Sequence, residues 1–121
     1  MNLDIEGAEL MALRGAADLL ERQAVDFVVS EVRFVADYEG QPLLAELVEH
    51  MAGVGYTLFN LYAPAESALR QALFGDATFV SEAMRRLLHE TYGEQVCGWH
   101  HRRPDPDGLS TAPRQSQSSS R

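Results

Sequence analysis

Hydrophobic positions in the first third of the chain follow two different periods. A short apolar stretch at residues 1–5 ends at Glu6-Gly7, and apolar residues then recur at helical spacing up to Leu20. Residues 25–32 are rich in β-branched side chains and almost continuously apolar, which is typical of a strand buried on both faces of a parallel sheet. The pattern predicts a strand, a helix and a central strand, in that order.

A second helix and two more strands are predicted in the middle of the chain. Apolar residues between 43 and 51 form one helical stripe after Pro42, a residue that suits the first helical position. Residues 56–62 alternate aromatic and aliphatic side chains, as in a strand, and residues 77–80 form a shorter strand. No helical crossover is evident between these two strands, so we expect them to pair antiparallel.

The remaining segments complete the predicted order of elements. Residues 69–74, between the last two strands, are compatible with a helical turn. Ser81 and Glu82 are suited to the N-cap and the acidic first turn of a final helix, which is expected to run to about Tyr92. Alternation of strands and helices in this order predicts an α/β sheet with helices on its faces.

Composition limits the size of the folded part. A chain of 121 residues with 45% hydrophobic residues has room for one compact domain. From His101 onward the chain consists mainly of Arg, Pro, Asp, Gly, Ser and Gln, with Leu109 as its single leucine. We therefore expect a domain at residues 1–100 and a disordered tail at residues 101–121.

The charge and the cysteine content restrict the expected partners and location. Ten basic residues stand against 18 acidic ones, a formal net charge of −8, so neither nucleic acid nor an anionic membrane surface is an expected partner. All ten basic residues are arginine, which excludes a catalytic lysine. Cys97 is the single cysteine and cannot form an intramolecular disulfide, and the apolar runs are far shorter than the ~20 residues of a membrane span. A cytoplasmic location is expected.

Several blocks of sequence, taken together, resemble a known enzyme family. Leu-Asp-Ile-Glu-Gly-Ala-Glu at residues 3–9 is followed by Leu-Arg-Gly-Ala at 13–16, Ser-Glu-Val at 30–32, Gly-Tyr at 55–56 and Gly-Asp-Ala-Thr-Phe-Val at 75–80. The series is similar to FkbM-type S-adenosylmethionine-dependent methyltransferases, which carry Lys-x-Asp-x-Glu-Gly-Ala-Glu and then Leu-x-Gly-Ala. Several blocks in the family's order are far more specific than any one of them.

The resemblance implies the second half of a Rossmann-like methyltransferase sheet. Its fourth to seventh strands would lie at residues 3–5, 25–32, 56–62 and 77–80, with the last strand antiparallel. This agrees with the order of elements that the hydrophobic pattern predicts. The resemblance also implies an O-methyltransferase that transfers a methyl group from S-adenosylmethionine to a small-molecule acceptor, the hydroxyl of a sugar or secondary metabolite.

The sequence departs from the family pattern in two respects: a motif lysine is replaced, and the residues that bind the cofactor are absent. The family's lysine, two residues before the aspartate, corresponds to Asn2. The glycine-rich loop and the acidic residue that hold S-adenosylmethionine have no counterpart, and the Gly-Val-Gly at 53–55 follows a helix instead of a strand. The cofactor site is thus expected to be incomplete. A fragment of a longer enzyme, a reading frame that starts at an internal methionine and a truncated gene product would all explain this.

Three carboxylates are the candidate catalytic residues. Asp4 and Glu6 end one predicted strand and Glu31 ends its neighbour, and ligands of open α/β sheets bind beyond the carboxyl ends of strands. The three could accept hydrogen bonds from an acceptor hydroxyl or act as its general base. Alternatively, they could hold a divalent cation that lowers the pKa of that hydroxyl.

A purely structural role is the competing interpretation of the same carboxylates. Glu6 and Glu9 would then serve only the positive end of the helix that follows, and Glu31 would form an ion pair with Arg14 or Arg33. The competing function for the whole chain is a non-catalytic α/β remnant or interaction module. Its exposed sheet edge would lead to self-association.

The other residues with chemical potential give weaker signals. His50 and His89 are predicted on helices as partly exposed surface residues. The His-His pair at 100–101 lacks the spacing of metal ligands, so no metal site is expected there. Among the aromatic residues, Tyr38 and Tyr62 lie beside predicted loops and are best placed to contact a substrate.

Overall fold

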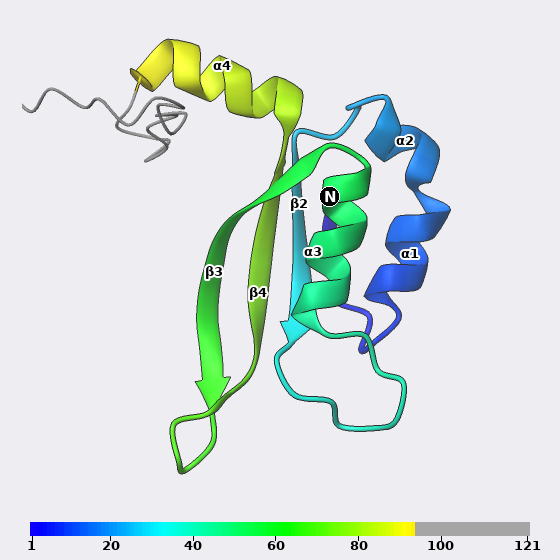
Figure 1. The fold of residues 1–121 in the computed structure, drawn as a ribbon, viewed down its shortest axis with the longest axis vertical. Helices are drawn as coiled ribbons and strands as arrows, with labels where there is room; N and C mark the ends of the chain where they lie inside the picture. Colours follow the sequence, from blue (N-terminus) through cyan, green and yellow to red (C-terminus); the bar gives the residue numbers. More distant parts are fainter. Residues whose placement is uncertain (94–121) are drawn as a thin grey trace, which may run out of the picture.

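The computed structural model of the chain describes residues 1–93 as an α/β fold (Figure 1). The elements in chain order are β1 (Asn2–Leu3), α1 (Glu9–Gly15), α2 (Ala17–Glu21), β2 (Phe27–Arg33), α3 (Leu44–Gly53), β3 (Tyr56–Glu66), β4 (Ala72–Ser81) and α4 (Glu82–Tyr92). The predicted fold class is confirmed. The predicted boundary at residue 100 and the predicted tail lie outside the described residues.

The described strands form one mixed sheet in the order β1-β2-β4-β3. β1 pairs parallel with β2, whereas β4 pairs antiparallel with both β2 and β3. β2 and β3 therefore run in the same direction, with the last strand inserted between them in the opposite direction. This is a partial Rossmann-like sheet, and the expected antiparallel pairing of the last two strands is confirmed.

The helices between parallel strands all lie on one face of the sheet. Right-handed crossovers from β1 to β2, and onward in the same direction to β3, place α1 and α3 on the same side. In Figure 1 these two helices stand side by side, and contacts join them to each other. The residues of the shared core are Leu10, Leu13, Leu20, Val28, Val32, Leu47, Met51, Tyr56, Ala77 and Phe79.

Strand β2 carries apolar side chains on both faces, as its almost continuous hydrophobicity predicts. Val28 and Val32 are buried against the helices, whereas Phe27 and Val29 alternate with them and face the opposite side. There the Phe27 ring meets the ring of Phe59 from β3 edge-on, with 6.0 Å between the ring centroids.

The hairpin of β3 and β4 is longer than predicted, and the helical turn predicted at 69–74 is wrong. The chain reverses in a tight loop in which the Ser67 backbone N–H donates to the Gln71 carbonyl at 2.9 Å. The hydroxyl of Ser67 also accepts from the backbone N–H of Leu69 and of Gln71, and Arg70 adopts a positive φ of 63°. Antiparallel pairing across this loop extends both strands beyond their alternating segments.

Two helices differ from their predicted limits. The first predicted helix is divided at Ala16, directly after Gly15, a residue that is unfavourable in a helix interior. The helix predicted to begin at Pro42 starts at Leu44. Its preceding backbone N–H, on Leu43, donates to the Glu46 carboxylate at 2.9 Å.

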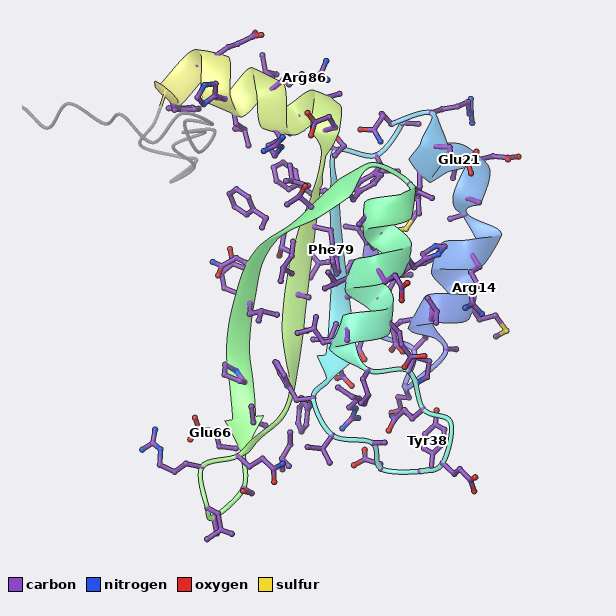
Figure 2. The ribbon with its side chains drawn as sticks, in the orientation of Figure 1. Arg14, Glu21, Tyr38, Glu66, Phe79 and Arg86 are labelled. Carbon is purple, nitrogen blue, oxygen red and sulfur yellow. The ribbon has the colours of Figure 1, made fainter. Side chains whose placement is uncertain are left out.

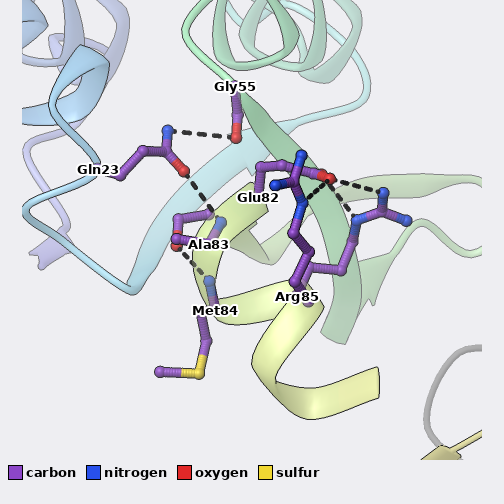
Figure 3. A network of polar contacts seen from close by, with 8 residues as sticks. Gln23, Gly55, Glu82, Ala83, Met84 and Arg85 are labelled. Carbon is purple, nitrogen blue, oxygen red and sulfur yellow. Dashed lines mark hydrogen bonds and ion pairs between the residues drawn. The ribbon is translucent and has the colours of Figure 1, made fainter. Parts of the chain in front are cut away.

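The amino end of α4 is joined to the helical layer by side-chain to backbone hydrogen bonds (Figure 3). Ser81 is the N-cap as predicted, and its hydroxyl accepts from the backbone N–H of Met84 at 3.1 Å. The Gln23 amide donates to the carbonyl of Val54 at 3.1 Å, and its oxygen accepts from the backbone N–H of Ala83. One side chain thus connects three segments at this end of the sheet.

Tyr56 adds another link at the same end. Its hydroxyl donates to the carbonyl of Val25 at 2.6 Å, and the residue is 2% exposed. Burial raises the pKa of the Tyr56 hydroxyl.

Within residues 1–93, no helix has both the length and the apolar character that crossing a membrane requires.

Candidate active site

The pairing of β1 with β2 determines where the candidate carboxylates lie. Leu3 is opposite Ser30 in this parallel pair, so Asp4 and Glu31 occupy the next position along the two neighbouring strands. Leu3 packs against the core and Ser30 is fully buried. Because side chains alternate along a strand, Glu31 faces the side of the sheet away from α1 and α3. Asp4 is exposed directly after β1.

Glu6 lies in the turn between β1 and α1. It adopts a positive φ of 51°, and Gly7 follows with a φ of 101°, so two successive residues have left-handed backbone conformations. The chain turns back sharply here and leaves Glu6 exposed. The turn therefore places the Glu6 carboxylate in solvent, just beyond the end of β1.

Glu9 has a different role from the other carboxylates of this motif. It is only 6% exposed, and its two carboxylate oxygens accept from the backbone N–H groups of Ile5 at 3.0 Å and Gly7 at 2.8 Å. Glu9 therefore does more than interact with the positive end of the helix. Its carboxylate stabilises the turn that carries Glu6 by accepting two backbone hydrogen bonds from that turn.

Arg33 forms an ion pair with Glu31. It is one of the two partners of Glu31 that the sequence suggests. The Arg33 Nη2 atom lies 3.1 Å from Glu31 Oε1, and Nη1 lies 3.0 Å from Asp37 Oδ2. The guanidinium also lies over the ring of Phe74 on β4, 4.7 Å from the ring centroid. Arg14, the other partner considered, is exposed on the outer side of α1 (Figure 2).

The loop at residues 34–43 closes this end of the site. Gln41 is 5% exposed, and its side-chain oxygen accepts from the backbone N–H of Asp37 at 2.7 Å. Tyr38 is half exposed on the same loop, which lies below the helices in Figure 2. Its hydroxyl occupies the space that a Cβ atom on Gly7 would require. The loop after β2 therefore touches the turn after β1.

The structure brings these carboxylates to one end of the sheet without forming a metal site. Within residues 1–93, no group of three or more His, Cys, Asp or Glu residues is arranged to hold a metal ion. Among these residues Asp4, Glu6 and Glu31 do not form a three-carboxylate cluster, and their joint use of a cation stays a prediction. The use of individual carboxylates toward a hydroxyl stays a prediction.

Arg33, Asp37 and Gln41 are site residues that the sequence did not single out as a group. The available signal was the spacing of Arg33 and Asp37, which are four residues apart on either side of a strand end.

Of the two predicted helical histidines, His89 is exposed and His50 is partly buried. The Nε2 atom of His50 is buried without a hydrogen-bond partner among the described residues. His100-His101 and Cys97 lie outside them.

Two backbone N–H groups of the β1–α1 turn are already used within the chain. A turn that binds the carboxylate of S-adenosylmethionine needs free backbone N–H donors at a strand-to-helix junction. In the β1–α1 turn, the N–H groups of Ile5 and Gly7 already donate to Glu9. No Gly-x-Gly sequence occurs between a strand and a helix within residues 1–93.

Comparison with known families supports the resemblance seen in the motifs. Residues 1–58 match the model of the methyltransferase FkbM domain. No curated protein and no solved structure matches the chain. The matched region contains β1, β2, the helices on one face of the sheet and the start of β3, and so includes all three candidate carboxylates. Residues 1–58 of this chain are thus similar to the methyltransferase FkbM domain.

Proposed function

We propose that this chain supplies the acceptor side of an S-adenosylmethionine-dependent O-methyltransferase. The acceptor is a hydroxyl group of a sugar or secondary metabolite, a small molecule that reaches the carboxyl ends of β1 and β2. The observation that carries this proposal is the parallel register, in which Asp4 follows β1 beside Glu31 on β2. The family match supports methyl transfer as the reaction class.

The chemistry of methylation at oxygen assigns separate tasks to the carboxylates. A hydroxyl must lose its proton as its oxygen forms the new bond to carbon, and a carboxylate within hydrogen-bond distance can accept that proton. We assign this task to Asp4, because it is exposed and follows β1 at the position next to Glu31 of β2. Glu31 is held in place by Arg33 through Oε1 and orients the acceptor by accepting a hydrogen bond through Oε2.

Glu6 completes the acceptor side from the β1–α1 turn. Its exposed carboxylate binds a second hydroxyl of a polyhydroxylated acceptor, which suits a sugar better than a compound with a single hydroxyl. S-adenosylmethionine supplies the methyl group in this class of reaction. Positioning of the acceptor is a large part of catalysis, because well-oriented reactants gain effective molarities of about 10⁵ M or more.

The test is acceptor binding followed by transfer, both with the 121-residue chain. Methyl hexopyranosides and hydroxylated lactones would be titrated into the ¹⁵N-labelled protein, and amide shifts are expected at Asp4, Glu6 and Glu31. Asp4→Asn and Glu31→Gln should weaken binding by about tenfold, because each removes a charge-assisted hydrogen bond. Glu21→Gln is the matched control, since Glu21 is exposed on the outer side of α2 (Figure 2).

The same panel, supplied with S-adenosylmethionine, tests whether the chain alone also carries out the transfer. Formation of methyl ether together with S-adenosylhomocysteine would show a usable cofactor site, and Asp4→Asn should then lower the rate about 100-fold or more, because the general base is removed. Absence of localised shifts at the three carboxylates with every member of the panel would overturn the acceptor-side proposal.

A second candidate, an interaction module, is favoured by a separate observation. β1 is an edge of the described sheet, with only two residues paired to β2. The opposite edge, β3, is protected by register shifts and by Pro64. We propose that the exposed β1 edge pairs with a second copy of the chain.

A further inference from the structure

The side chain of Arg33 joins β2, β4 and the loop at residues 34–43. It occupies the last position of β2, opposite Phe74 in the antiparallel register with β4. Its two terminal nitrogens bind two different carboxylates, those of Glu31 and Asp37. The side chain of Arg33 is 22% exposed and that of Glu31 is 21% exposed, so this pair is largely shielded from solvent.

The combination of these contacts requires the shape of a guanidinium group. One nitrogen reaches back along the strand to Glu31 and the other reaches forward to Asp37, while the flat face lies over the ring of Phe74. A lysine ammonium carries the same charge but is a single point, without two separated donors and a stacking face. The arrangement therefore depends on geometry as well as on charge.

The contact with Asp37 extends into the loop. The backbone N–H of Asp37 donates to the buried side chain of Gln41, and the backbone N–H of Gln41 donates to the carbonyl of Tyr38 at 3.3 Å. Tyr38 in turn lies against Gly7, in the turn that carries Glu6. A continuous series of contacts thus runs from Glu31 through Arg33 and the loop to the turn after β1.

We propose that Arg33 is a positioning residue for the acceptor side of the site. It holds the carboxylate of Glu31 in one orientation and, through Asp37, fixes the loop so that Tyr38 stays against the β1–α1 turn. The two carboxylate-bearing segments are thereby kept at a constant separation for one acceptor molecule. This role in acceptor binding rests on the proposed function, whereas the fastening of the loop does not.

Amide hydrogen exchange of the full 121-residue chain tests the fastening directly. In Arg33→Gln and Arg33→Lys, the amides of Asp37 and Gln41 should exchange about tenfold faster than in the wild type, because their loop is released. The amide of Phe34 donates to the carbonyl of Leu73 and should be unchanged, which shows that the strands stay paired. Arg14→Gln is the matched control, an exposed arginine on α1.

A variant of the partner and the acceptor titration complete the test. Asp37→Asn should reproduce the faster exchange, and adding it to Arg33→Gln should give no further increase. Acceptor binding should weaken about tenfold in Arg33→Lys at an unchanged midpoint of thermal unfolding. Unchanged exchange at Asp37 and Gln41 in Arg33→Gln would overturn the inference, whatever the acceptor does. Faster exchange in Arg33→Gln, together with no acceptor binding by the wild type, would refute the proposed function and leave the fastening established.

Discussion

Removing the carboxylate of Glu9 should destabilise the fold more than removing any exposed carboxylate of the same motif. Glu9 is 6% exposed and accepts two backbone hydrogen bonds, from Ile5 at 3.0 Å and from Gly7 at 2.8 Å. Those donors lie in a turn with two positive φ values, a backbone conformation that needs support from its surroundings. The substitutions Glu9→Gln and Glu9→Ala separate the effect of charge from that of the whole side chain.

The expected loss follows from the two hydrogen bonds. A hydrogen bond to a charged group is worth about 1.5–3 kcal/mol. Glutamine has one acceptor oxygen and an NH₂ group that would face the second backbone donor, so Glu9→Gln keeps at most one bond and should cost about 2 kcal/mol. Glu9→Ala leaves both N–H groups without this acceptor and should cost about 3 kcal/mol.

Urea unfolding at pH 7, followed by circular dichroism, measures the difference. Glu21→Gln, at an exposed position on α2, should change the free energy of unfolding by less than about 0.5 kcal/mol. If Glu9→Gln were as stable as this control, Glu9 would not hold the β1–α1 turn. The conclusion that Glu9 occupies the backbone N–H groups of Ile5 and Gly7 would then be wrong as well.

Three further predictions concern other parts of the described region. Gly7→Ala should cost about 2 kcal/mol in urea unfolding, because a positive φ disfavours alanine and the new Cβ would collide with the Tyr38 hydroxyl; a smaller loss in a Tyr38→Ala background would confirm the collision, and an equal loss would exclude it. Hydrogen bonds from Arg85, and also from Arg86, hold the pKa of Glu82 below its usual 4.5. Glu82→Gln should therefore lower the free energy of unfolding by less than about 1 kcal/mol at pH 7, since the side chain is over one-third exposed. This difference from the wild type should shrink as the pH falls below 4.5 and the carboxyl of Glu82 becomes protonated. A difference that does not change between pH 7 and pH 3 would contradict this. Sedimentation velocity should show dimers formed through the β1 edge, and a monomer over the whole concentration range would count against that pairing.

The sequence predicts most of the fold, because each predicted element has a local cause. The apolar run at residues 25–32 has β-branched side chains on both faces and becomes a strand at the interior of the sheet. Ser81 has the residue type of a helix N-cap and is one. The order of strands and helices also limits the connections, so the mixed sheet follows from few assumptions.

The errors arise where tertiary contacts decide the local structure. Residues 69–74 have helix-forming side chains, but pairing of β3 with β4 gives more hydrogen bonds than an isolated helical turn would. Similarly, Arg33 can be recognised as a possible partner of Glu31 from their proximity in sequence. Its stacking on Phe74 cannot be anticipated, because the register that joins residues 41 positions apart is a property of the sheet.

The arrangement of the sheet separates the residues that support the fold from those of the candidate site. Strand β2 ends at the lower side of Figure 1, and the loop at residues 34–43 that follows it contacts the β1–α1 turn. Gln23, Tyr56 and Ser81 make their hydrogen bonds at the opposite end. At the site end, the backbone is supported by side chains that are themselves polar, chiefly Glu9 and Arg33. A substitution there changes the shape of the turn and loop around Asp4 and Glu31, whereas a substitution at the other end should change stability without changing that shape.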